Sequence, residues 1–126
     1  MPMSAADNPK TVLIVDDSKF TRIKLKSMLE KNGYEVTGEA EDGRQAVDMC
    51  KELKPAIVTM DITMPEMDGL SSLKQIMDLN TGAKVVMISA LGQKQKVLEC
   101  IKAGAADYVV KPFNKDTIAA KIDKLK

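Results

Sequence analysis

The sequence predicts one α/β domain in which a doubly wound, five-stranded parallel sheet is covered by helices on both faces. Three observations support this prediction. Short apolar runs rich in β-branched residues alternate five times with longer segments of helical periodicity. Turn-forming residues separate most of these segments. Charged side chains follow directly after the first, third and fifth apolar runs, at the positions where parallel strands would end together.

The apolar runs define five expected strands, and the segments between them define five expected helices. The second run is the most polar, which is typical of a strand at a sheet edge. The expected strands are Thr11 to Val15, Glu35 to Glu39, Ala56 to Met60, Lys84 to Ser89 and Asp107 to Val110. The expected helices are Lys19 to Lys31, Arg44 to Leu53, Leu70 to Leu79, Lys94 to Lys102 and Lys115 to Leu125.

Capping and turn residues support these boundaries in chain order. Asn32-Gly33 ends the first helix, Asp42-Gly43 begins the second, and Lys54-Pro55 leads into the third strand. Thr81-Gly82 leads into the fourth strand, and Ala103-Gly104 ends the fourth helix. In the last helix, an apolar stripe with lysines outside it indicates packing on a sheet. The stripe is Ile118, Ile122 and Leu125, and the lysines are Lys115, Lys121, Lys124 and Lys126.

Composition narrows the possible functions. With 126 residues, we expect one domain and no second folded module. The hydrophobic fraction of 44% and charged fraction of 29% are typical of a soluble globular protein, and the net charge of +1 gives no general attraction to nucleic acid or membranes. The absence of histidine excludes Ser-His-Asp and Cys-His nucleophile systems and zinc sites that use histidine.

Cysteine content and the chain start predict the compartment. Cys50 and Cys100 are too few for a disulfide scaffold, so we expect buried or half-buried thiols in a reducing environment. No apolar run resembles a signal peptide or approaches the roughly 20 residues that span a bilayer. We therefore expect a cytoplasmic protein without a membrane partner. Residues 1–10 would form a flexible tail, and residues 11–126 the folded domain.

The strand ends carry the candidate functional residues. Asp16 and Asp17 follow the first strand, Asp61 follows the third, and Lys111 follows the fifth. Ligands bind parallel α/β sheets in the crevice outside the carboxyl ends of the strands, so we expect these side chains to meet there. Ser89, at the end of the fourth strand, would add a hydroxyl.

Three neighbouring carboxylates repel one another unless a cation neutralises them, and Mg²⁺ with its oxygen ligands is the natural choice. Asp61 follows the strand expected at the centre of the sheet and is the candidate nucleophile for a phosphoryl group. Lys111 would offset charge on the transferred oxygens, and Ser89 would donate a hydrogen bond to one of them.

Each residue also has a simpler interpretation. Asp16-Asp17 before Ser18 is compatible with a helix N-cap, Asp61 with a turn at a strand end, and Lys111-Pro112 with a surface turn. Their joint occurrence at three strand ends favours a shared functional site.

These residues also carry a family resemblance. The chain resembles the receiver domain of bacterial two-component response regulators over essentially Thr11 to Lys126. The resemblance implies a flavodoxin-like or CheY-like fold with strand order 2-1-3-4-5 and a cis Lys111-Pro112 bond. The matching segments are Ile14-Val15-Asp16-Asp17-Ser18, Met60-Asp61-Ile62-Thr63-Met64-Pro65-Glu66-Met67-Asp68-Gly69, Ser89-Ala90, Gly104-Ala105-Ala106-Asp107-Tyr108 and Lys111-Pro112-Phe113.

The resemblance also assigns roles to these residues. It implies that Asp61 becomes an aspartyl-phosphate and that Asp17, Asp61 and the backbone carbonyl of Thr63 hold Mg²⁺, with Asp16 acting mainly through water. Ser89 and Tyr108 would change position on phosphorylation. The partner surface would comprise residues 93–102, Tyr108 and residues 115–126, and the protein would act as a switch rather than as an enzyme.

The stand-alone receivers that the chain most resembles are those of chemotaxis. For these the phosphoryl donor is a sensor histidine kinase of the CheA type, and the phosphorylated form binds the flagellar motor switch. An intermediate in a phosphorelay, which passes the phosphoryl group to a histidine on another protein, is the alternative. Thr63 and Leu91 occupy positions that affect dephosphorylation in the family, and they leave the lifetime of the phosphoryl group open. The cognate partners and the oligomeric state also stay open, although we expect a monomer.

Three rival functions fit the sequence less well. Phosphatases of the haloacid dehalogenase type require a second Asp two residues after the nucleophile, where this chain has Thr63. In a flavin- or nucleotide-binding module, Asp16-Asp17 would repel a phosphate that lacks a metal, and Glu39-Ala40 stands where a P-loop requires Lys-Ser/Thr. A nucleic-acid-binding function is disfavoured because aromatic residues are few and acidic residues lie among the lysines.

Overall fold

Five parallel strands form the centre of the structure, a computed structural model that describes residues 9–64 and 66–125. The order along the sheet is β2-β1-β3-β4-β5, as the resemblance implied, and the polar second strand lies at an edge. The strands are β1 (Thr11–Val15), β2 (Glu35–Ala40), β3 (Ile57–Asp61), β4 (Lys84–Ser89) and β5 (Asp107–Val110). The helices are α1 (Lys19–Lys31), α2 (Gly43–Leu53), α3 (Gly69–Asp78), α4 (Lys94–Lys102) and α5 (Lys115–Asp123).

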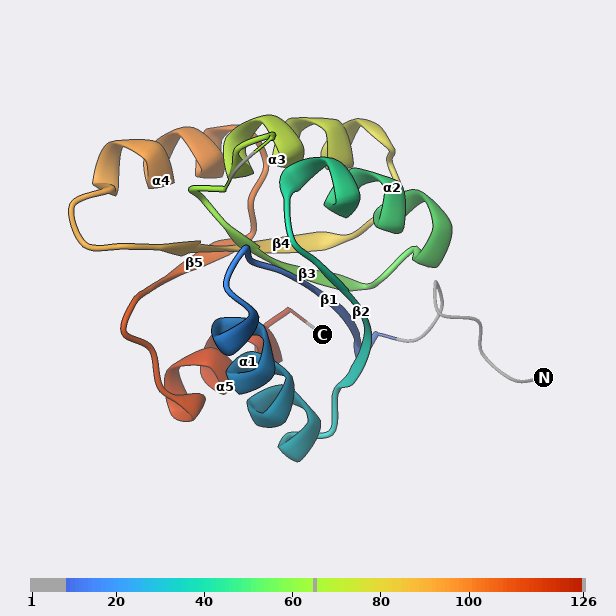
Figure 1. Ribbon diagram of the computed structural model, residues 1–126, viewed down its shortest axis with the longest axis vertical. Helices are drawn as coiled ribbons and strands as arrows, with labels where there is room; N and C mark the ends of the chain where they lie inside the picture. Colours follow the sequence, from blue (N-terminus) through green and yellow to red (C-terminus); the bar gives the residue numbers. More distant parts are fainter. Residues whose placement is uncertain (1–8, 65, 126) are drawn as a thin grey trace.

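Helices cover both faces of the sheet (Figure 1). Helices α1 and α5 pack on one face, and α2, α3 and α4 pack on the other. In β1, Val12 and Ile14 point to the first face whereas Leu13 and Val15 point to the second, and all four are fully buried. This strand therefore reads as a continuous apolar run, because neither face of it meets water.

Several expected boundaries were wrong by one or two residues. Asp61 is the last residue of β3 rather than the first loop residue, because it still pairs with Ile88 of β4. Helices α2 and α3 begin one residue early, since Asp42 and Asp68 act as N-caps for the glycines that follow them. Strand β2 extends to Ala40, which pairs with β1, and α3 and α5 end before the expected residues.

Two expectations at the chain ends concern residues outside the described part. Of the expected tail, residues 1–8 lie outside the described residues, and residues 9–10 form a turn before β1. Lys126, expected on the polar side of the last helix, also lies outside them. Ile118 and Ile122 are buried, and Leu125 packs beside them, as the stripe predicted.

Both cysteines are buried and form no disulfide, as expected. Burial raises the pKa of the Cys50 thiol to about 12, so this group stays protonated at neutral pH. Cys50 and Cys100 belong to the core between the sheet and helices α2 to α4. Within the described residues, no helix combines the length and apolar character that crossing a membrane requires.

Two glycines allow helix starts to lie against other backbone, α3 against the end of β3 and α2 against the loop that follows β3. A Cβ atom on Gly69 would lie 2.5 Å from the carbonyl oxygen of Asp61 and 2.7 Å from Cα of Ile62. A Cβ atom on Gly43 would lie 2.3 Å from the carbonyl oxygen of Met67. Because the obstructing atoms are backbone atoms, neither conflict can be relieved by a side-chain rotation.

Gly69→Ala is therefore expected to lower the free energy of unfolding by about 1–3 kcal/mol or more, the range for overpacking in a rigid environment. Urea denaturation followed by circular dichroism measures this change. Ser71→Ala, at an exposed position of the same helix, is the control and should change stability by less than about 0.5 kcal/mol. Equal effects of the two substitutions would show that the close approach at Gly69 is not a constraint.

Candidate functional site

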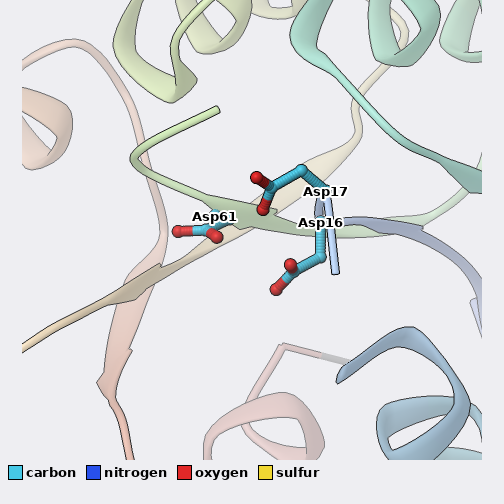
Figure 2. Close-up of side chains that lie close together, drawn as sticks. All are labelled: Asp16, Asp17 and Asp61. Atoms are coloured by element: carbon cyan, nitrogen blue, oxygen red, sulfur yellow. The ribbon is translucent and has the colours of Figure 1, made fainter. Parts of the chain in front are cut away.

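Three carboxylates converge at the carboxyl edge of the sheet (Figure 2). Asp16 and Asp17 directly follow β1, and Asp61 ends the neighbouring strand β3. One oxygen from each carboxylate lies within 4.8 Å of one from each of the others. Asp16 is fully buried, Asp61 is 8% exposed and Asp17 is exposed, so the cluster opens to solvent on the Asp17 side.

Lys111 brings a cation from the end of β5 to the same place. Its Nζ lies 3.4 Å from Oδ2 of Asp61 and 3.5 Å from Oδ2 of Asp16. The backbone N–H of Lys111 donates to the carbonyl of Ser89 at 2.7 Å, which continues the pairing of β4 and β5. The structure therefore brings together the four charged residues whose convergence the sequence predicted. The Lys111-Pro112 bond is cis, as the resemblance implied.

The two oxygens of the buried Asp16 carboxylate differ in their contacts. Its Oδ1 accepts a hydrogen bond from the N–H of Ser18 at 2.8 Å. Its Oδ2 accepts no hydrogen bond from the described residues and lies only within ion-pair distance of Lys111. The N-cap of α1 is Ser18, whose hydroxyl accepts from the N–H of Thr21, so capping alone does not account for the acidic pair.

Arg22 binds the backbone of Asp16, a contact that was not predicted from the sequence. Its Nη1 donates to the carbonyl of Asp16 at 2.6 Å, and its Nε donates to Glu39 at 3.1 Å. Arg22 is only 6% exposed and shares the buried face of α1 with Leu25 and Leu29. That spacing along the helix was the available signal, because an arginine on the apolar stripe of a helix needs a buried acceptor.

The electrostatics of the site oppose the ionisation of Asp61. Burial and the neighbouring charge of Asp16 raise the pKa of Asp61, and Lys111 and the N–H of Thr63 offset this only in part. Burial by itself would lower the pKa of Lys111, but the carboxylates of Asp61 and Asp16 outweigh burial and raise it. Among the described residues, the salt bridges of this three-carboxylate cluster come from Lys111 alone, so its acidic groups outnumber its paired cations.

This arrangement fits a divalent cation with oxygen ligands. The carboxylates are close enough to share one ion, and the buried Oδ2 of Asp16 lacks a hydrogen-bond donor. A hard dication such as Mg²⁺ would relieve the repulsion and prefers carboxylate and carbonyl ligands. Asp16, Asp17, Asp61 and the carbonyl of Thr63 are the residues that could hold it, directly or through water.

Two other predicted site residues lie on the strands and loops beside the cluster. Ser89 ends β4 next to Asp61 and is 1% exposed. Thr63 donates its N–H to Oδ1 of Asp61 at 3.3 Å. Its hydroxyl accepts from Nε2 of Gln93 at 2.8 Å, and Oε1 of Gln93 accepts from the N–H of Ala90 at 2.7 Å. The sequence carried no signal for this contact of Gln93, because the contact joins two separate loops.

Tyr108, the remaining predicted residue, lies on β5 away from the carboxylates. The side chain is 40% exposed, and Nζ of Lys121 lies 5.3 Å from its ring centroid. Tyr108 and Ser89 line one groove of about 260 Å³ between α4 and β5. Exposed apolar side chains border this groove, namely Leu91, Leu98, Ile101 and Val110.

Comparison with known proteins gives one consistent result. The family model of the response regulator receiver domain matches residues 12–123. The chain is 53% identical to the chemotaxis protein CheY of Thermotoga maritima over 92% of this chain and 97% of that protein. It is 51% identical to CheY of Bacillus subtilis over 90% of this chain and 94% of that protein.

Solved structures agree with the sequence comparison. A crystal structure of a CheX-CheY-BeF₃-Mg²⁺ complex from Borrelia burgdorferi contains a chain with a TM-score of 0.88 and 40% identity, covering 94% of this chain and 90% of that one. The response regulator domain of Thermotoga maritima CheB has a TM-score of 0.83 and 35% identity, covering 91% of this chain and 94% of that one.

Asp61→Asn is expected to stabilise the metal-free protein by an amount on the order of 1 kcal/mol, or roughly 3–5 °C in Tm. A carboxyl whose pKa is raised on folding destabilises the folded state once it ionises, so wild type loses stability as the pH rises through that pKa. Thermal unfolding in EDTA as a function of pH measures the difference, which should be large at neutral pH and vanish in acid. A lower Tm for the variant at neutral pH would contradict the repulsion argument.

Proposed function

The chain belongs to the response regulator receiver domain family, with CheY proteins among its relatives, and on this premise we propose that it is a phosphorylation-dependent signalling switch. In the proposed reaction, Asp61 accepts a phosphoryl group from a histidine of a sensor kinase in the presence of Mg²⁺. The observation that carries the proposal is the position of Asp61, a buried carboxylate at the end of the central strand, close to both an acidic pair and a lysine. A phosphoryl acceptor needs this combination of nucleophile and charge compensation.

The proposed transfer balances simply. An oxygen of Asp61 forms a bond to phosphorus, the bond from phosphorus to the kinase histidine breaks, and its electron pair stays on the imidazole. Bound Mg²⁺ would neutralise the carboxylates and the phosphoryl oxygens so that two anions can approach. Asp16, Asp17, Asp61 and the carbonyl of Thr63 would hold the ion. The hydrogen bond from Ser18 occupies Oδ1 of Asp16 and leaves Oδ2 without a hydrogen-bond donor among the described residues.

Lys111 and Ser89 would bind the transferred group. Lys111 Nζ lies 3.4 Å from Oδ2 of Asp61, so it is close to the carboxylate that would carry the phosphoryl group. Its pKa is raised, so it stays charged and can donate to a phosphoryl oxygen. Ser89, on the adjacent strand, would donate its hydroxyl to another phosphoryl oxygen. The fixed strand ends provide this arrangement before the donor arrives, which lowers the cost of organising it.

The proposed partner surface comprises residues 93–102, Tyr108 and residues 115–126, of which Lys126 lies outside the described residues. Movement of Ser89 toward the phosphoryl group would open space next to Tyr108, because both residues line the groove between α4 and β5. A partner that binds one arrangement of Tyr108 more tightly than the other would convert phosphorylation into binding. The exposed apolar side chains along this groove give such a partner a surface to bury.

We place this switch in chemotaxis, in the cytoplasm, as a monomer. The CheY relatives over nearly the whole chain support a chemotaxis role. For this role we propose a CheA-like kinase as donor and a flagellar motor switch protein as target. The Borrelia CheY solved with CheX, BeF₃ and Mg²⁺ supports Mg²⁺ as the cofactor and a second protein as partner.

Incubation with acetyl phosphate and Mg²⁺ is expected to add one phosphoryl group, measured by intact-mass spectrometry. The adduct should require Mg²⁺ and should be removed by hydroxylamine, as an acyl phosphate is. Asp61→Asn should lose it, because an amide is a poor nucleophile. Cys50→Ala is the matched control, since this thiol lies in the core away from the cluster. A stable adduct of equal yield on Asp61→Asn would refute the assignment of the acceptor.

Lys111→Ala is expected to retain Mg²⁺ binding, because the carboxylates remain, but to uncouple phosphorylation from the change at the α4–β5 groove. NMR chemical shifts of Tyr108 and α4 with and without BeF₃⁻ and Mg²⁺ measure this coupling. In wild type the shifts should change widely, whereas in the variant they should change by less than about a third as much if Lys111 supplies most of the differential interaction. Shifts of wild-type size in Lys111→Ala would contradict this role.

A further inference from the structure

A chain of three hydrogen bonds connects Asp61 to the start of α4. Thr63 donates its N–H to Asp61, Gln93 donates its amide to the Thr63 hydroxyl at 2.8 Å, and Ala90 donates its N–H to Gln93 at 2.7 Å. Thr63 belongs to the loop after β3, whereas Ala90 and Gln93 belong to the loop between β4 and α4. One glutamine side chain therefore joins the two loops that lie beside Asp61.

The orientation of this amide follows from its partners. A backbone N–H can only donate, so Oε1 of Gln93 must face Ala90 and Nε2 must face Thr63. Gln93 occupies the N-cap position of α4, but its side chain makes no capping bond to its own helix. The backbone carbonyl of Gln93 accepts a hydrogen bond from the N–H of Val97, a buried residue in the first turn of α4. The side chain thus serves the contact between loops, and the backbone of the same residue starts the helix.

We propose that Gln93 is a positioning residue that couples the metal- and phosphoryl-binding loop after β3 to the start of α4. This inference rests on the proposed function, in which the Thr63 carbonyl is a metal ligand and α4 is part of the partner surface. Gln93 would hold Thr63 in place for the ion, and bound Mg²⁺ would in turn hold Gln93 and the first turn of α4. The two effects must be equal in free energy, because coupling between sites is reciprocal.

The coupling can be tested with substitutions that remove one end of the contact at a time. Gln93→Met keeps the length of the side chain but removes both hydrogen bonds, and Thr63→Val keeps the shape of the side chain but removes the hydroxyl. Thr63→Ser retains the hydroxyl, so amide exchange at Ala90 and the Mg²⁺ Kd should stay close to the wild-type values. Gln45→Met is the matched control. The side chain of Gln45 in α2 also accepts a hydrogen bond from a preceding backbone N–H, that of Glu41, which directly follows β2.

Two NMR measurements on the full chain give the readouts. The first is the rate of amide hydrogen exchange at Ala90 and Val97 in EDTA, and the second is the Mg²⁺ Kd from titration with MgCl₂. We expect Thr63→Val to speed exchange at Ala90, although it leaves the acceptor of that amide in place. Thr63→Val and Gln93→Met should each raise the Kd by about threefold to tenfold, the range for one hydrogen bond. The double variant should be no worse than either single variant.

Unchanged exchange at Ala90 in Thr63→Val, or Kd effects that multiply in the double variant, would overturn the inference. So would effects of the same size in Gln45→Met. A failure of the proposed function looks different, since wild type itself would then show no response to MgCl₂. In that case the coupling to metal falls with the proposed function, while exchange at Ala90 in EDTA still decides whether Gln93 positions the two loops.

Discussion

Repulsion between the buried carboxylates of Asp16 and Asp61 is the constraint on which the rest of the site depends. Two such groups would separate or take up a proton unless the backbone held them together. The N–H of Asp16 is bonded to the carbonyl of Ala40 in β2, and Asp61 is paired with Ile88 in β4. Lys111 is fixed by its own backbone bond to Ser89. The sheet thus holds unfavourable charge in a fixed place, which makes the site ready for a cation.

The two sides of this edge differ in how firmly they are held. On the α2–α3 side, Gly43 and Gly69 bring helix starts against backbone atoms, and the hydroxyl of Ser72 donates to the carbonyl of Gly43 at 2.8 Å. On the α4–β5 side, the described residues leave a groove and exposed apolar side chains. A change at Asp61 is therefore expected to spread toward α4 and β5, because packed backbone on the other side leaves little freedom to move.

Local chemistry explains how much could be predicted. Apolar runs gave all five strands, and Asp42 and Asp68 are recognisable N-caps whose helices were misplaced by one residue only because a glycine follows each of them. Asp16, Asp17, Asp61 and Lys111 could be found because parallel strands place their carboxyl ends at one edge. Arg22 could have been found from its position on the buried stripe of α1, whereas nothing local distinguishes Gln93 from any other loop glutamine.

The sequence by itself determined the fold class, the approximate positions of the five strands and the chemical identity of the acidic cluster, because these follow from periodicity and from residues next to one another in the chain. Only the tertiary structure decided that Asp16 keeps one oxygen without a hydrogen bond and that Arg22 supports it from behind. It also decided that Gln93 joins Thr63 to Ala90. These features depend on distances between segments that are remote in sequence, and such distances are set by packing of the whole domain rather than by local preference.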